Sequence, residues 1–219
     1  MQERIGCKKL NIDGFTISYY GQLPEKGIFV SFSSKSSSYG NRCLYSTALE
    51  IAFNGYDGVY IPGSSSASIF EKGILDAGGK LFPVLPYSLE SASRGILSKA
   101  MVSNGGVFSP FADSFSIDKI DKAKTIASII SNVSIVAEEN IRYRKTFNYI
   151  DTALSYGKDV AILKSSLLSP FARTLAREGA PVIDSFSSFL QFPKYIVFYQ
   201  EHGMYGIDDG SFDIMYIDE

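Results

Sequence analysis

The sequence predicts an α/β protein with a doubly wound, mainly parallel sheet and a short C-terminal β tail, and three observations support this fold class. First, residues 133–137 and 159–163 are apolar runs rich in β-branched side chains and too short for helices, as is typical of buried strands. Second, apolar side chains between them, at positions 147–154, recur at helical spacing. Strand, helix and strand then form one βαβ unit whose strands run parallel. Third, the order strand, small-residue loop and helix repeats through the first half of the chain.

The other elements follow from the same patterns, taken in chain order. Residues 15–20 are expected to form a strand at a sheet edge, and the apolar segment 27–32 predicts a central strand. Lys158 follows the helix predicted at residues 146–156 and is expected to place a cation at the negative, C-terminal end of that helix. Further strands are expected at residues 57–61, 80–85 and 107–109, and helices at 42–54, 93–103, 118–132, 146–156, 169–179 and 185–191, with one more helix ending at 77. The parallel sheet should therefore contain 28–32, 57–61, 81–85, 133–137 and 159–163.

Three segments divide the chain. Residues 1–25 form an N-terminal edge strand or arm, 26–193 the α/β domain, and 194–219 a C-terminal β tail. From residue 195 onward, apolar and polar residues alternate and glycines interrupt them. This alternation predicts a hairpin and not another βαβ unit.

Composition limits the possible partners and compartments. The net charge of −2 gives no global basic field, so any anion site must be a local cluster of cations. Two cysteines far apart form no disulfide framework and indicate a reducing compartment. The amino terminus lacks an apolar signal core, and no run reaches the ~18 apolar residues of a membrane span. We therefore expect a cytoplasmic protein without a membrane partner.

Several catalytic and cofactor motifs are missing from the sequence. A zinc site needs three or four ligands, and His202, Cys7 and Cys43 have no recognisable spacing. There is no G-x-S-x-G, no second histidine, no Walker motif and no intact G-x-G-x-x-G, so we expect neither a hydrolase triad nor a cofactor. The carboxylates that could supply acids are Asp57, Glu71, Glu138 and Glu139. Because the pair after residue 137 is also typical of a capping or solvated pair, the sequence favours a protein that is not an enzyme.

Phosphate binding has better support, from three loops predicted at the carboxyl edge of the sheet. Residues 31–39, 63–66 and 142–146 are small, hydroxyl-bearing or basic. Such loops before helix N-termini present backbone N–H groups and a positive dipole to anions. The candidate ligands in them are Ser33, Lys35, Gly63, Ser64, Arg142, Arg144, Lys145 and Thr146. In the simpler alternative, the serines only cap helices and the cations form a solvated loop.

The order and spacing of these loops resemble the Rossmann-like core of the DNA-processing protein A family (DprA, also called Smf). Residues 31–40, SFSSKSSSYG, are similar to the family's V-G-S-R-x-x-S-x-Y-G, with Phe32 and Ser34 in place of the glycine and arginine. Residues 62–66 and 78–90 resemble its S-G-x-A-x-G-I-D and G-G-x-T-I-A-V-L segments, although the aspartate is missing. Residues 153–163, ALSYGKDVAIL, are close to its A-L-x-x-G-R-x-V-F-A-V. The resemblance covers residues 26–185.

The resemblance implies single-stranded DNA as partner, with a role in natural transformation and recombination; a recombinase and a second copy of the chain are further implied partners. The family motif F-x-x-R-N-R falls on residues 120–125, where Lys122 and Lys124 flank the positions of the two arginines. With Lys35, Arg144 and Lys145 they would line a phosphate-binding pocket, in which charge matters more than residue identity. Two aromatic residues, Tyr39 and Tyr143, would stack on bases. Lysine lacks the bidentate fork of arginine, so weaker binding is expected.

A nucleotide or NAD-derived signal is the alternative ligand. Related Rossmann-like proteins that cleave N-glycosidic bonds carry P-G-G-x-G-T-x-x-E, and residues 62–63 begin that pattern. Ser64, Ser65 and Ser66 interrupt it, and Glu71 lies too far along to match the acid. For nucleotide binding, the hydroxyls expected to matter are those of Ser33, Ser64 and Thr146.

Overall fold

The computed structural model describes residues 7–12, 14–138, 148–191, 195–199, 204–208 and 215–217, the last three ranges as backbone strands only. Its main sheet has six strands in the order β5-β4-β3-β7-β8-β9, all parallel. The strands are β3 (Gly27–Phe32), β4 (Asp57–Tyr60), β5 (Leu81–Pro83), β7 (Val133–Ala137), β8 (Asp159–Leu163) and β9 (Val182–Ile183). The predicted doubly wound sheet and its βαβ unit are therefore confirmed.

Both faces of this sheet are buried, as the apolar runs of the sequence require. Along β3 every residue is buried, and alternate side chains enter different cores. Ile28 and Val30 belong to one hydrophobic cluster, while Phe29 belongs to the other. The same alternation in β7 sends Ile135 and Val136 to opposite faces.

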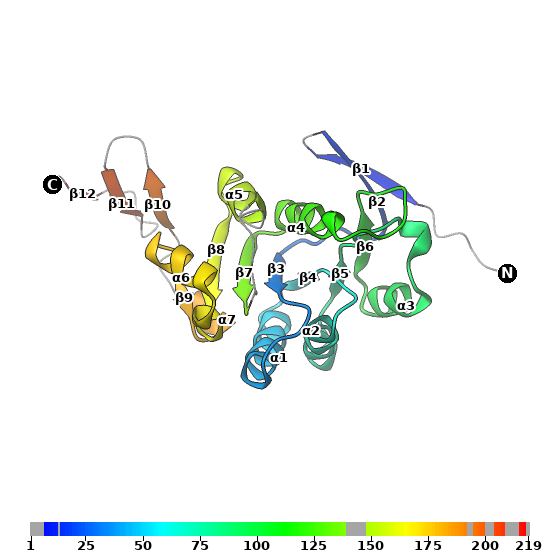
Figure 1. Cartoon of the computed structure of the whole chain (residues 1–219), viewed down its shortest axis with the longest axis horizontal. Coiled ribbons are helices and arrows are strands. Elements are labelled where there is room, and N and C mark those ends of the chain that lie inside the picture. Colours follow the sequence, from blue (N-terminus) through cyan, green and yellow to red (C-terminus); the bar gives the residue numbers. More distant parts are fainter. Residues whose placement is uncertain are drawn as a thin grey trace.

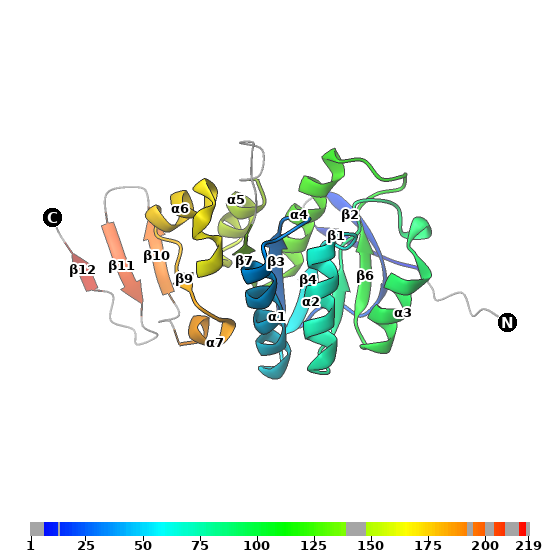
Figure 2. The same ribbon diagram turned by 60° about the horizontal axis from the view of Figure 1, so that its bottom comes forward.

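Helices cover the two faces in separate layers (Figure 1). One layer contains α1 (Ser38–Phe53), α2 (Ser65–Asp76) and α7 (Phe186–Phe189), and the other α4 (Asp118–Ile130), α5 (Asn148–Ser155) and α6 (Pro170–Arg177). Figure 2 shows α1 and α2 side by side, in blue and teal. Gly73 permits this close approach, because a Cβ there would lie 2.6 Å from Cβ of Ala48. The loops that precede these two helices are thereby brought to the same end of the sheet.

A second, three-stranded sheet has the order β1-β2-β6 and is antiparallel. Its strands are β1 (Lys8–Ile12), β2 (Phe15–Gly21) and β6 (Gly106–Ser109). The prediction that 15–20 lies at a sheet edge is wrong, because β1 pairs with its outer side. The sequence KKLNI of β1 is short and mostly exposed, so it carries little apolar pattern. A parallel bridge between Val84 and Phe108 joins this sheet to the main one, and α3 (Arg94–Val102) packs beside β5 and β6.

The C-terminal tail contains three antiparallel strands, β10 (Tyr195–Tyr199), β11 (Met204–Asp208) and β12 (Met215–Ile217). The predicted hairpin corresponds to β10 and β11, and β12 adds a third strand to it. His202 lies outside the described residues.

Lys158 has a different role from the predicted one. Its ammonium donates hydrogen bonds to the carbonyls of Ile129 and Ser131, at the C-terminus of α4 and not of its own helix α5. These carbonyls have no partner within the helix, and a cation there also offsets the helix dipole. Partial burial lowers the pKa of Lys158, which is the expected effect of desolvation on a cation.

We expect Lys158→Met to lower the free energy of unfolding by about 1–2 kcal/mol, because two charge-assisted hydrogen bonds are lost. Urea unfolding of the variant and of the unmodified protein measures this difference. Lys9→Met is the control, since Lys9 is exposed on β1 and should change stability by no more than about 0.5 kcal/mol. Equal small effects in both variants would contradict a capping role for Lys158.

Candidate functional site

The main sheet has a topological switch point between β3 and β7. These strands are neighbours, with Phe32 paired to Ala137 at their carboxyl ends. The chain leaves β3 toward β4 on one side, and it leaves β7 toward β8 on the other. In open α/β sheets, ligands bind in the crevice that such a divergence creates. A ligand site is therefore expected at the segments that follow Phe32, Tyr60 and Ala137.

Two of the three predicted loops are joined there by hydrogen bonds. The backbone N–H of Ser36 donates to Oγ of Ser66 at 3.0 Å, and the hydroxyls of the same two residues lie 3.1 Å apart. Oγ of Ser65 donates to the carbonyl of Ser34 at 3.0 Å. The hydroxyl groups after β3 and β4 thus bind one another across the edge of the sheet.

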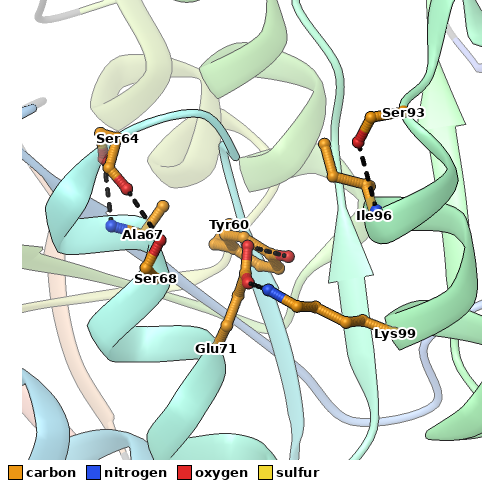
Figure 3. Close-up of polar contacts among 8 residues, drawn as sticks. All are labelled: Tyr60, Ser64, Ala67, Ser68, Glu71, Ser93, Ile96 and Lys99. Atoms are coloured by element: carbon orange, nitrogen blue, oxygen red, sulfur yellow. Dashed lines mark hydrogen bonds and ion pairs between the residues drawn. The ribbon is translucent and has the colours of Figure 1, made fainter.

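Serine side chains in these loops also cap the helices that follow. Oγ of Ser37 accepts from the N–H of Gly40 at 2.9 Å, and Oγ of Ser64 accepts from the N–H of Ala67 at 3.0 Å (Figure 3). This cap starts α1 at Ser38, four residues before the predicted start. Within the first loop, Oγ of Ser33 donates to the carbonyl of Lys35. Ser37 and Ser64 therefore cap helices, as the simpler alternative expects for the loop serines, whereas Ser33 does not.

Glu138, the residue that follows β7, is bound to the first of these loops. The carboxylate of Glu138 accepts hydrogen bonds from the N–H and the hydroxyl of Ser37, at 2.7 and 2.5 Å. Glu138 therefore caps α1 from the end of β7, a long-range form of the capping expected for this carboxylate. Glu139 and the third predicted loop lie outside the described residues, so its candidate residues are not placed by the structure: Arg142, Tyr143, Arg144, Lys145 and Thr146.

Exposed side chains surround the joined loops. Lys35 and Gly63 are exposed in the loops, and Arg42 is exposed on α1. Tyr39, in the first turn of α1, is 60% exposed. A hydrogen bond with the thiol of Cys43 raises the pKa of Tyr39. The edge thus offers cations and one aromatic ring on an open surface.

A further lysine, missed in the sequence, lies near this ring. Lys164 directly follows β8 and forms an exposed ion pair with Asp184 at 3.1 Å. The thiol of Cys43 raises the pKa of Tyr39, and the positive charge of Lys164 has a smaller, opposite effect. The sequence could have indicated Lys164 as a site residue, because it directly follows a predicted strand that ends at the same edge of the sheet.

The two lysines predicted on α4 occupy different environments. Lys122 is exposed, and its ammonium lies 5.6 Å from the ring centroid of Phe15 and 5.9 Å from that of Phe111. Lys124 is 9% exposed and lies 5.6 Å from the ring centroid of Tyr149. Burial lowers the pKa of Lys124 from 10.5 to about 8. The structure therefore places Lys122 at the surface beside β2 and Lys124 in the interior of the helical layer.

Glu71 is held in a buried polar cluster (Figure 3). Its carboxylate accepts from the hydroxyl of Tyr60 at 2.9 Å and pairs with the ammonium of Lys99 at 2.5 Å. Glu71 is 5% exposed and Tyr60 is 1% exposed. Burial is the main cause that raises the pKa of Tyr60 well above 10.0. This carboxylate is therefore an ion-paired member of the core that links α2 to Tyr60 of β4 and to Lys99 of α3.

Among the residues that the structure describes, no group of three or more His, Cys, Asp or Glu could hold a metal ion. None of the helices described is long and apolar enough to cross a membrane.

Comparison with known proteins identifies the fold. No family model matches the sequence, and no curated protein matches it. The structure is similar to DNA processing protein A from Streptococcus pneumoniae, with a TM-score of 0.66 and 18% identity over 81% of this chain. It is equally similar to DNA processing protein A from Helicobacter pylori, described for its single-stranded DNA binding mode, with a TM-score of 0.66, 15% identity and 87% of this chain covered.

A molybdenum cofactor binding protein from Rippkaea orientalis is also similar, with a TM-score of 0.52 and 16% identity over 78% of this chain and 94% of that one. The chain spans 66% of the Streptococcus protein and 97% of the Helicobacter protein. At such identities the likeness concerns the fold alone. The chain has the doubly wound, Rossmann-like fold of these proteins.

Proposed function

We propose that this protein binds single-stranded DNA across the carboxyl edge of its main sheet, as a relative of the DNA-processing proteins. The observation that carries the proposal is the pair of joined serine loops at the β3–β7 switch point, with Lys35, Tyr39 and Arg42 exposed around them. Because the loop hydroxyls bind one another, the edge forms a surface that suits an extended strand. Phosphates of such a strand need spread positive charge, and its bases need an exposed ring for stacking.

Two further features support this reading over nucleotide cleavage. The likeness to the Helicobacter protein, which binds single-stranded DNA, covers most of both chains. Glu71, the acid that follows residues 62–66 in the sequence, is paired with Lys99 and buried. The sequence-predicted cations Arg142, Arg144 and Lys145 and the ring of Tyr143 complete the proposed interface, with Ser33, Gly63, Ser64 and Thr146 contributing polar contacts. Natural transformation, with a recombinase and a second copy of the chain as partners, is the proposed setting.

Titration of a fluorescent single-stranded oligonucleotide at several salt concentrations tests this function. Each phosphate contact on a single strand lowers log K by about 0.7 per decade of salt. The double variants Arg144→Ala with Lys145→Ala, and Lys35→Ala with Arg42→Ala, should each weaken binding and reduce the salt slope by about one to two contacts.

The matched control changes two arginines of α6. Arg173 and Arg177 are exposed on this helix, and their replacement by alanine should leave affinity and slope within about twofold of the unmodified protein. Equal losses in all three double variants would mean diffuse electrostatic attraction without a site. Absence of binding by the unmodified protein at low salt would end the DNA hypothesis. ATP and NAD, tested in parallel for a rise in melting temperature, report on the nucleotide alternative.

A further inference from the structure

Glu138 adopts a backbone conformation that L side chains rarely take. Its φ is 46°, and Asn104 is the other non-glycine residue with positive φ in the described part of the chain. Such a residue is uncommon and persists where its surroundings hold it in place. Here the buried hydroxyl of Ser166 accepts from the N–H of Glu138 at 2.6 Å and donates to the carbonyl of Val136 at 2.9 Å. The chain therefore turns sharply as it leaves β7, and this turn directs the carboxylate toward α1.

The carboxylate of Glu138 lies in direct contact with the N-terminus of α1. Besides the two hydrogen bonds from Ser37, it lies against Gly40, where an added Cβ would be 2.1 Å from Oε2 of Glu138. The helix has 16 residues, so its N-terminus attracts anions. In doubly wound proteins that bind nucleotides, a phosphate occupies this place after the first strand of the sheet. In this protein a carboxylate of the chain itself fills it.

We propose that Glu138 determines which class of ligand binds at this site. Its carboxylate excludes the terminal phosphate of a nucleotide from the N-terminus of α1. Phosphates of an extended strand can then bind only at the exposed cations Lys35 and Arg42. This inference rests on the proposed DNA-binding function. A phosphate at α1 would have to displace the carboxylate and its two charge-assisted hydrogen bonds, or lie beside its negative charge. Both routes disfavour phosphate at the helix while leaving Lys35 and Arg42 accessible.

The test removes the carboxylate and measures the binding of inorganic phosphate. Glu138→Gly suits the positive φ and deletes the carboxylate, and Glu138→Gln keeps the shape of the side chain without its charge. We expect phosphate, at constant ionic strength, to raise the melting temperature of Glu138→Gly. The half-maximal phosphate concentration should be about 10- to 100-fold lower than for the unmodified protein, the factor that corresponds to one charge-assisted hydrogen bond. Glu138→Gln should fall between the two.

Two controls locate the effect. Adding Gly40→Ala to Glu138→Gly fills the vacated space with a methyl group, so the gain in phosphate binding should disappear. Glu178→Gln removes one negative charge at the end of α6 and should change nothing. A phosphate response of the unmodified protein equal to that of Glu138→Gly would overturn the proposal, as would a gain that survives Gly40→Ala.

The outcome is separable from that of the DNA hypothesis. If the unmodified protein binds no single-stranded DNA but Glu138→Gly gains phosphate binding, the proposed function fails and the excluding role of Glu138 stands. If the protein binds DNA and Glu138→Gly gains nothing, the function stands and the role assigned to Glu138 fails.

Discussion

Replacement of Glu71 by alanine is expected to lower the free energy of unfolding by about 2–4 kcal/mol. The loss leaves the hydroxyl of Tyr60 unpaired in the core, where that residue is 1% exposed. An unpaired buried hydroxyl costs about 1–3 kcal/mol, and the missing side chain leaves a cavity. The side chain of Lys99 is 48% exposed and can turn to water, which keeps the loss below that of a fully buried ion pair. Chemical denaturation measures the difference.

A matched tyrosine–carboxylate pair, whose carboxylate also lies on α2, provides the control. Tyr45 donates to the carboxylate of Asp76 at 2.7 Å, the same chemistry as the bond from Tyr60 to Glu71, but at an exposed position. Asp76→Ala should therefore change stability by less than about 1 kcal/mol. If Glu71→Ala cost no more than Asp76→Ala, the buried cluster of Tyr60, Glu71 and Lys99 would not stabilise the fold.

Replacement of Lys124 by methionine is expected to have the opposite sign and to stabilise the protein at pH 7. Burial lowers the pKa of Lys124 from 10.5 to about 8, and one pKa unit corresponds to about 1.4 kcal/mol. In the folded state the charged amine is therefore less favourable than the neutral amine by about 3 kcal/mol. The variant also loses the contact with the ring of Tyr149 and the other contacts of the amine. Methionine has a similar shape without the charge, so a net gain of about 1–2 kcal/mol is expected.

The pH dependence of this gain distinguishes it from better packing. Below pH 8 the amine is protonated in both the folded and the unfolded chain, so the cost is present in full. Between pH 8 and 10.5 the folded protein releases the proton first, and its stability rises relative to the variant. The gain should therefore shrink over this interval and change sign above it, because a cost of about 3 kcal/mol is removed from the unmodified protein. Asp121 is the charged neighbour that raises the pKa. A gain that does not change with pH would contradict the desolvation account.

The sequence predicted the sheet well because its central strands are apolar on both faces. Runs such as 133–137 and 159–163 need no tertiary information to be recognised, and their parallel pairing follows from the helix between them. The strand β1 was missed, since its exposed residues give no apolar pattern and its pairing with β2 decides its structure. Lys158 was assigned to the wrong helix for a similar reason: α4 reaches it only in the folded chain.

The candidate site was predicted in outline and not in its contacts. Serine loops after β3 and β4 could be placed at one edge by the alternation of strands and helices. Their mutual hydrogen bonds depend on the close approach of α1 and α2 at Gly73. The hydrogen bond from Ser37 to the carboxylate of Glu138 joins residues 101 positions apart, so no local sequence pattern predicts it. Lys124 is buried beside Tyr149 of another helix. The sequence alone could not distinguish it from the exposed Lys122, because both are lysines in the same predicted helix.

Photocrosslinking tests most directly whether the carboxyl edge at the β3–β7 switch point holds a single strand. An oligonucleotide that carries a photoreactive thymidine analogue is bound at low salt and irradiated, and the attached peptides are identified by mass spectrometry. The proposal predicts crosslinks at Tyr39, which is 60% exposed in the first turn of α1, and in the peptide that contains Tyr143. Tyr39→Leu should abolish the first of these. Crosslinks confined to the β1-β2-β6 sheet or to α6, with none at residues 33–42 or 139–147, would contradict the account.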